Sequence, residues 1–215
     1  MGFSKNTVSV LFIIISVFSV SAVSFALDGK RVFIDEKCGL CHDTTEAGRG
    51  ESQKSGPPLW YAGSKFKQGF IAEWLGNPLP IRPLAYRSLN DINPGNHPRL
   101  EKDEAKAVSG YLMRLTAKNV VSGVIKPGAG KGGGVIFEKK GGCYGCHRIK
   151  KDTAAAGGGL SGPSLVGSED RLNPDWIYAY LKDQRSFKPP DGMPVYEGIM
   201  EDRELRILAG YLSPR

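Results

Sequence analysis

The stretch Cys38-Gly39-Leu40-Cys41-His42 is matched later in the chain by Cys143-Tyr144-Gly145-Cys146-His147, and both have the pattern C-x-x-C-H. This pattern is typical of covalent haem attachment, in which two thiols bond to the haem vinyl groups and the next histidine binds the iron. The two stretches use all four cysteines and two of the three histidines. The sequence therefore predicts two covalently bound haem c groups, with Cys38, Cys41, Cys143 and Cys146 as tethers and His42 and His147 as proximal iron ligands.

Two other chemistries also use cysteine pairs of this spacing. A zinc site needs four converging ligands, and the two motifs together could supply them. A zinc site would not explain two further features of the sequence, an N-terminal export signal and the repeated sequence around each motif, which are described below. A thioredoxin-like redox pair needs a βαβ context, which the sequence lacks. We therefore favour haem attachment.

The first 26 residues have the pattern of a secretory signal peptide. Lys5 is their only charged residue, an apolar run covers residues 8–20, and Ser24-Phe25-Ala26 places small residues around a cleavage site. Cleavage after this site would leave a chain that begins at Leu27 and has no membrane span. An uncleaved anchor is the alternative, although the apolar run is shorter than the ~20 residues of a spanning helix. Covalent haem attachment takes place outside the bacterial cytoplasm, so we expect a periplasmic protein.

The charge of the chain is basic, with 29 lysines and arginines against 22 aspartates and glutamates. After the signal peptide, the parts before and after residue 125 each carry 14 basic and 11 acidic residues. Such surfaces can steer a charged partner protein toward the molecule. The sequence has no combined aromatic and basic motif to support nucleic-acid binding. We expect a protein redox donor and acceptor and no nucleic acid, with a homodimer or a complex with a larger oxidoreductase left open.

The sequence around the two motifs repeats, and the motifs lie 105 residues apart. Glycine-rich residues 116–134 separate the repeats and predict a linker. We place the domain boundary near residue 125, which gives a signal peptide over 1–26 and domains over 27–125 and 126–215. The matching segments are 29–33 with 133–137, 56–59 with 162–165, 70–75 with 176–181, and 104–112 with 204–212.

The repeated segments have helical periodicity. In the last of them, Leu205, Leu208 and Leu212 recur at spacings of three and four residues. The acidic residues at its start favour a helix N-terminus, where the backbone dipole stabilises negative charge. Each repeat therefore predicts a helix, the haem motif, a loop, a second helix, a loop and a third helix. The expected fold class is all-α.

This order resembles class I cytochrome c taken twice, in a tandem layout similar to that of dihaem cytochromes of the c4 kind. The resemblance covers nearly all of the chain after the signal peptide. It implies that the first and last helices of each domain cross where a glycine meets an aromatic residue. It also implies that a proline packs near each proximal histidine, with its backbone orienting the ring. The matching residues are Gly29 with Tyr111, Gly132 or Gly133 with Tyr211, and the prolines Pro57 and Pro163.

The second axial ligand of each iron decides between an electron carrier and a catalyst. In the family, a methionine before a proline lies in the loop ahead of the last helix, which indicates Met193 for the second haem. Met200 aligns with the apolar Leu100, so we expect it to pack in the core. The first repeat has no methionine in this loop. There His97 precedes a proline and is the expected ligand of the first haem, with an exposed loop histidine as the alternative.

The path from the middle helix to His97 is about ten residues longer than the path to Met193. Methionine ligation raises the potential of a haem iron relative to paired histidines, so we expect electrons to pass from the first haem to the second. The charged loop residues Arg82, Arg87 and Asp91 are given no catalytic role. The aromatic residues Trp60, Tyr61 and Trp74 are expected to pack against haem.

The leading interpretation is a periplasmic electron carrier with two six-coordinate haems and no catalytic residue. One alternative is a small haem enzyme that acts on peroxide or nitrogen oxides at an open first haem. The other alternative is the electron-transfer subunit of a larger oxidoreductase.

Overall fold

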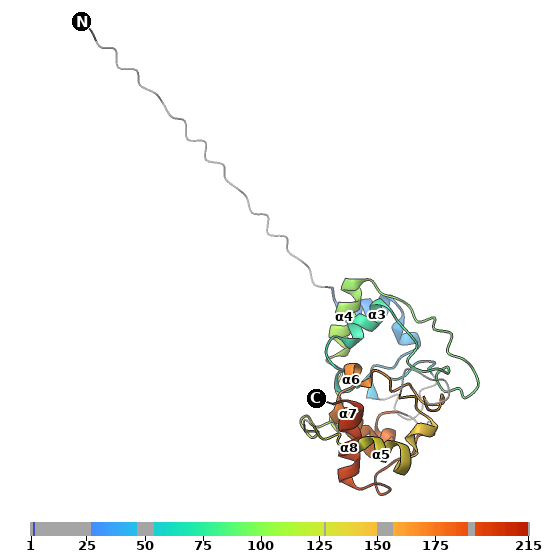
Figure 1. The fold of residues 1–215 in the computed structure, drawn as a ribbon. Helices are drawn as coiled ribbons and strands as arrows, with labels where there is room; N and C mark the ends of the chain where they lie inside the picture. The colour runs from blue at the N-terminus through green and yellow to red at the C-terminus, as the bar shows by residue number, and fades with distance from the viewer. Residues whose placement is uncertain are drawn as a thin grey trace.

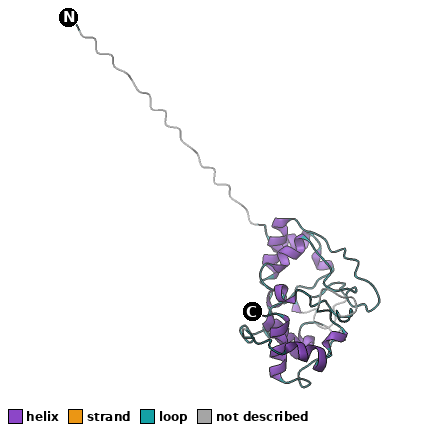
Figure 2. Ribbon diagram, viewed as in Figure 1, coloured by secondary structure: helices purple, strands orange, loops and turns teal. Residues whose placement is uncertain are grey.

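The computed structural model describes residue 2 and residues 27–46, 54–126, 128–149, 157–188 and 192–214. The predicted signal peptide, apart from Gly2, lies outside these ranges. The described residues form helices and isolated bridges, with no strand among them, so the all-α prediction is confirmed for this part (Figure 2). Within the same ranges, no helix is long and apolar enough to cross a membrane.

The first helical cluster consists of α1 (Gly29–Asp35), α3 (Phe70–Gly76) and α4 (Lys102–Leu112). Helix α4 is central, because both α1 and α3 pack against it. It begins with a capping box in which the Glu101 and Glu104 side chains satisfy free backbone N–H groups of the first turn. The buried core of this cluster consists of Phe33, Ala62, Ile71, Leu75, Leu100, Ala105, Val108 and Leu112.

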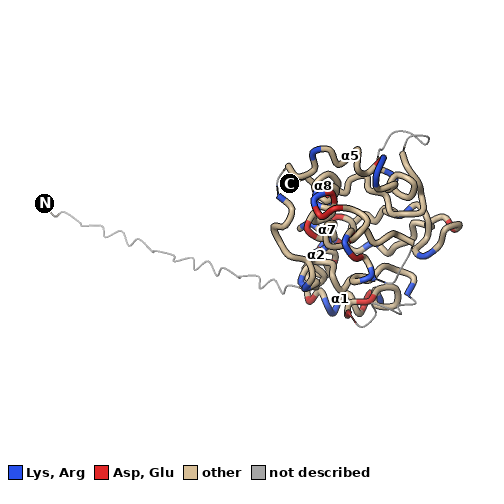
Figure 3. The backbone as a smooth tube through the Cα atoms, turned by 90° about the horizontal axis from the view of Figure 1, so that it is seen from below, with Lys and Arg blue, Asp and Glu red and all other residues tan. Residues whose placement is uncertain are grey.

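The second helical cluster consists of α5 (Gly133–Val135), α7 (Pro174–Lys182) and α8 (Asp202–Leu212), and it lies below the first cluster in Figure 1. Helix α5 continues into a π-helical turn, η3 (Ile136–Lys140), and α8 packs against both α5 and α7. Helix α8 has the same capping box as α4, and acidic and basic positions mix along it (Figure 3). Its apolar face is buried through Leu205, Leu208, Ala209 and Leu212.

Each cluster contains a close helix crossing at a glycine. A Cβ atom on Gly29 would lie 1.8 Å from the Ala107 carbonyl oxygen and 3.1 Å from Tyr111 Cβ. A Cβ atom on Gly133 would lie 2.3 Å from Tyr211 Cβ. A Cβ atom on Gly132 would meet no heavy atom of the described chain within 4 Å. Only glycine allows these helices to approach so closely, and Gly133 is the residue at the second crossing.

The segment between the clusters is fixed to the second one. Ile125 is 1% exposed. The buried Asp175 carboxylate, on α7, accepts hydrogen bonds from the backbone N–H groups of Gly123 and Ile125, both at 2.8 Å. Arg206 donates to the carbonyl oxygen of Val124 at 3.2 Å. Residues just before the predicted domain boundary therefore pack on α7 and α8, while the boundary itself stays a prediction.

We expect Asp175→Ala to destabilise the protein by about 3 kcal/mol, since it leaves the buried Ile125 N–H and the partly buried Gly123 N–H unpaired, at about 1–3 kcal/mol for a buried group. Guanidinium unfolding measures this difference in free energy. Asp170→Ala, at an exposed acidic position of α6 (Ser168–Arg171), is the matched control and should change the free energy by less than about 0.5 kcal/mol. Equal stability of the two variants would contradict the anchoring role of Asp175.

A junction of aromatic residues joins the two clusters. Trp60 and Tyr61, from the first repeat, lie in the core of the second cluster. The Trp60 indole N–H donates to the carbonyl oxygen of Phe187 at 3.2 Å, and the Tyr61 ring stacks on Trp176 with centroids 6.1 Å apart. Backbone hydrogen bonds accompany these contacts, including Asn173 N–H to the Lys65 carbonyl oxygen at 2.8 Å. The two repeats are thus packed together through both side chains and backbone.

Lys65 in this junction gives a testable dependence of stability on pH. Its Nζ lies 4.8 Å from the Phe66 ring centroid and 5.1 Å from that of Trp176. Burial, together with the charges of Lys188, Arg171 and Arg82, lowers the pKa of Lys65 to about 7. An unfolded lysine has a pKa of about 10.4, so between these values the unfolded chain binds more protons. Stability should therefore rise as pH increases through this window.

We expect Lys65→Met to be more stable than wild type at about pH 6.5 and to lose most of this advantage at about pH 9.5. Unfolding free energies at the two pH values measure the effect. Lys102→Met, at an exposed position of α4, controls for the loss of one positive charge. If the difference in unfolding free energy between wild type and Lys65→Met did not change with pH, the lowered pKa of Lys65 would be contradicted.

Candidate haem-binding sites

The two C-x-x-C-H motifs have the same backbone conformation. Each begins with a 3₁₀ turn, η1 (Cys38–Leu40) or η4 (Cys143–Gly145). The residue before each turn is left-handed, with φ of 56° at Lys37 and 59° at Gly142. In both motifs the histidine N–H donates to the carbonyl oxygen of the first cysteine at 3.0 Å. Two cysteines and one histidine are thereby held within a single tight turn in each repeat.

All four cysteines carry free thiols. Cys41 and Cys146 are exposed, whereas Cys38 and Cys143 are half-buried. Burial raises the pKa of the Cys38 and Cys143 thiols above the ordinary cysteine value. Among the described residues, no group of three or more His, Cys, Asp and Glu side chains could hold a metal ion. The described residues therefore do not form the converging ligand set that the zinc alternative requires.

The two predicted proximal histidines are oriented by proline carbonyl groups. His42 Nδ1 lies 2.7 Å from the Pro57 carbonyl oxygen, and His147 Nδ1 lies 2.8 Å from that of Pro163. Because a carbonyl oxygen only accepts hydrogen bonds, Nδ1 must carry the proton in both rings. The lone pair is then on Nε2, the nitrogen that can bind a metal. Burial also lowers the pKa of His42, which favours its neutral, metal-binding form.

A glycine lies against the ring of each predicted proximal histidine. A Cβ atom on Gly56 would be 2.5 Å from His42 Cε1, and one on Gly162 would be 2.6 Å from His147 Cε1. Each glycine also donates its N–H to the carbonyl oxygen of the motif's second cysteine, Cys41 or Cys146. The Gly-Pro pair therefore both makes room for the ring and supplies its hydrogen-bond acceptor.

His97 faces the proximal histidine of the first motif. The His97 and His42 ring centroids are 6.1 Å apart, with 46° between the ring planes. Two imidazoles on opposite sides of one metal, with metal–nitrogen bonds of about 2 Å, have centroids about 6 Å apart. His97 Nδ1 donates to the Pro98 carbonyl oxygen at 2.9 Å, so its lone pair is also on Nε2. The geometry suits an iron between these rings, and ligation by His97 stays a prediction.

Trp74, on α3, supports His97 from the side. The Trp74 and His97 ring centroids are 4.6 Å apart in an edge-to-face arrangement. The Trp74 indole N–H donates to the Leu79 carbonyl oxygen at 2.8 Å, which fixes the indole relative to the loop that follows α3. Trp74 therefore packs on the predicted distal ligand, whereas Trp60 and Tyr61 pack in the junction.

The loop that carries His97 contains a small hairpin. Leu84 pairs with Ile92 in an antiparallel bridge, and Asn93 N–H donates to the Pro83 carbonyl oxygen at 3.0 Å. The Asn93 side chain also donates to the Arg82 carbonyl oxygen at 3.0 Å. The additional residues of the first repeat thus form this hairpin. His97 follows the hairpin in the chain.

Met193 is half-buried and packs against the core of the second cluster. Its carbonyl oxygen accepts a hydrogen bond from the Gln184 side chain. The three residues before Gly192 lie outside the described residues, so their part of the predicted ligand loop is not placed. Met200 is 6% exposed and lies in the same core, where a Cβ atom on Gly141 would be 2.9 Å from its Cε. Met193 is thus the more accessible of the two methionines.

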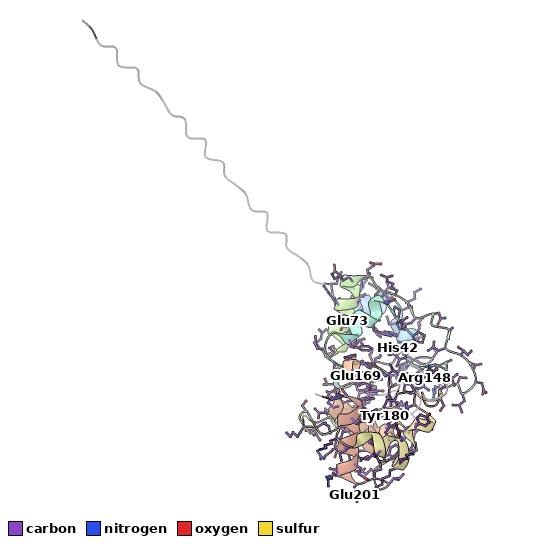
Figure 4. The ribbon with its side chains drawn as sticks, in the orientation of Figure 1. His42, Glu73, Arg148, Glu169, Tyr180 and Glu201 are labelled. Carbon is purple, nitrogen blue, oxygen red and sulfur yellow. The ribbon has the colours of Figure 1, made fainter. Side chains whose placement is uncertain are left out.

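Each motif packs on the helical segment that precedes it, η1 on α1 and η4 on η3. Figure 4 shows His42 and Arg148, the residue after His147, at the level where the two clusters meet. The Nε atoms of Arg82 and Arg148 are both buried. Neither atom has a hydrogen-bond partner among the described residues. Buried arginine donors normally have acceptors, so an anionic group would be well accommodated here.

A match to a known protein family agrees with the motif in the second repeat. Residues 128–212 match the family described as cytochrome C oxidase, cbb3-type, subunit III. This match supports, for residues 128–212, the general predictions of a c-type cytochrome domain with covalent haem c and a role in electron transfer. The tandem arrangement, the number of haems and the ligands stay predictions.

Among solved structures, the chain is similar to a chain of the reducing HAO-like protein complex of Kuenenia stuttgartiensis. The identity is 15% and the TM-score 0.33, over 86% of this chain and 94% of that chain. No curated protein is significantly similar in sequence. A likeness of this degree does not establish a shared fold or function.

Proposed function

We propose that this protein is a periplasmic dihaem c-type cytochrome that carries electrons between two redox partner proteins. In this proposal the signal peptide directs export, and tandem cytochrome c domains over residues 27–125 and 126–215 each hold one haem c. The observation that carries the proposal is the position of the His97 ring opposite His42. A second protein ligand leaves no position on the iron for a substrate, which favours a carrier over an enzyme.

The residues present fit two haems of this kind. Each motif combines free thiols with a histidine whose lone pair is on Nε2. The buried, unpaired Nε atoms of Arg82 and Arg148 suit the carboxylates that a haem carries. When bound, each haem iron alternates between Fe(II) and Fe(III) and so takes up and releases one electron.

The residues of the chain set the properties of the two sites. Pro57 and Pro163 hold the proton on Nδ1 of each proximal histidine, which raises the basicity of the ligating nitrogen. His97 would add a second imidazole at the first site. Met193 would add a thioether at the second site, and a thioether stabilises Fe(III) less than imidazole does. The second site would then have the higher potential, and an electron on the first haem would pass preferentially to the second.

Haem content and electron paramagnetic resonance of the oxidised, purified protein test this proposal together. We expect two haems per chain and two low-spin ferric signals with no high-spin component. A single haem per chain would contradict the dihaem assignment. A stoichiometric high-spin signal would mean that one iron is open, and would overturn the carrier in favour of a haem enzyme.

A further inference from the structure

The loop that presents His97 also reaches the proximal side of the second site. At the base of its hairpin, the Ile81 carbonyl oxygen accepts a hydrogen bond from Ser164 N–H at 2.8 Å. The next residue, Arg82, donates from its guanidinium to the Ser161 carbonyl oxygen at 3.0 Å. Ile81 and Arg82, which are consecutive in the first repeat, thus form hydrogen bonds with Ser164 and Ser161 of the second repeat.

These two contacts enclose the acceptor of the second proximal histidine. Pro163 lies between Ser161 and Ser164, and its carbonyl oxygen accepts the His147 Nδ1 proton at 2.8 Å. The same segment is held from within its own repeat, because Gly162 N–H donates to the Cys146 carbonyl oxygen at 2.8 Å and Arg171 donates to the carbonyl oxygen of Ser164. The orientation of the Pro163 carbonyl is therefore set by groups from both repeats.

We propose that Arg82 is a positioning residue that couples the two haem sites. By holding residues 161–164, it fixes the Pro163 carbonyl on His147 and thereby sets the basicity of the second proximal ligand. The same loop carries His97 to the first site, so one segment controls the distal side of one haem and the proximal side of the other. This inference rests on the proposed function, since it requires a haem bound by His147.

The expected sign follows from the hydrogen bond. A weaker Nδ1–H bond makes the imidazole a poorer donor, which stabilises Fe(III) less and raises the potential. Loss of the Arg82 charge acts in the opposite direction, because a nearby positive charge favours the reduced iron. Arg82→Lys keeps the charge and therefore separates these two effects, while a second control removes one charge elsewhere in the same loop. Arg87→Asn is suitable because Arg87 is exposed and has φ of 64°, which asparagine tolerates.

The experiment compares Arg82→Met, Arg82→Lys and Arg87→Asn as haem-loaded proteins. Amide exchange at Ser164 is measured by NMR, and the potential of each haem by spectroelectrochemical titration. In Arg82→Met we expect Ser164 exchange about tenfold faster than in Arg87→Asn. We also expect a reduction equilibrium constant of the second haem three- to tenfold higher than in that control, which is about 28–59 mV for one electron. Arg82→Lys keeps the charge without the planar guanidinium and should show smaller changes in the same direction.

The coupling would be overturned if both Arg82 variants matched Arg87→Asn in amide exchange at Ser164 and in the potential of the second haem. Haem content and spin state are read on the same samples. A single haem per chain, or a high-spin first haem in wild type, would refute the proposed function. Altered Ser164 exchange in that case would still report the contact made by Arg82, so the two failures are distinguishable.

Discussion

Replacing His97 with alanine is expected to convert the first haem of the oxidised protein from a low-spin to a high-spin ferric state. About half of the low-spin signal should be lost, because one iron of two loses its second ligand while the other is unchanged. The physical reason is geometric: the His97 ring lies 6.1 Å from His42, and its Nδ1 is occupied by the Pro98 carbonyl, so Nε2 is the nitrogen available to the iron. Electron paramagnetic resonance and the absorption spectrum both measure the change.

Chemical rescue makes this prediction specific. Free imidazole should bind the opened iron of His97→Ala and restore the low-spin signal, which a protein that had merely lost its structure would not do. Asn96→Ala changes the exposed neighbouring residue and should leave both low-spin signals intact. Met193→Ala should produce the equivalent change at the second haem alone. Two undiminished low-spin signals in His97→Ala would show that His97 is not a ligand.

Much of the helical fold could be predicted from the sequence, because its signals are local. The spacing of apolar residues and the acidic first turn placed a helix at 204–212, and the structure has α8 at Asp202–Leu212 with its capping box at Glu201. The repeat then placed α4 in the first half by analogy. The glycine at each helix crossing was predictable through the family resemblance, and the structure distinguishes Gly133 from Gly132 because only one of them faces Tyr211.

The contacts between the repeats could not be predicted in this way. Trp60 and Tyr61 contact Phe187 and Trp176, more than 100 residues away in the sequence, while their packing against haem stays a prediction. No periodic pattern encodes such a pairing. The hairpin before His97 was visible only as a difference in loop length of about ten residues. The reach of Arg82 to Ser161 depends on how the two clusters pack, so a charged loop residue gave no sign of it.

The glycines beside the proximal rings lead to the second large prediction, Gly162→Ala. Its Cβ atom would lie 2.6 Å from His147 Cε1, 2.7 Å from His147 Nδ1 and 3.0 Å from the Cys146 carbonyl oxygen. The ring cannot rotate away easily, because Nδ1 is bonded to the Pro163 carbonyl in the same segment. Either the segment moves and the hydrogen bond to His147 is lost, or the ring tilts from its position. Overpacking of this kind typically destabilises a protein by about 1–3 kcal/mol.

We therefore expect Gly162→Ala to lower haem incorporation at the second motif, or to shift the spectrum and potential of that haem, while the first haem stays unchanged. Gly56→Ala, whose Cβ atom would lie 2.5 Å from His42 Cε1, should have the same effect on the first haem alone. Gly145→Ala is the matched control, since it adds the same methyl group inside the second motif where no heavy atom of the described residues lies within 4 Å. Haem content, potentials and unfolding free energies of the three variants measure these effects. If Gly162→Ala and Gly145→Ala behave alike, the close contact does not constrain the ring. If each glycine affects only its own haem, the two Gly-Pro segments act as separate supports for two proximal ligands, as two haems in one chain require.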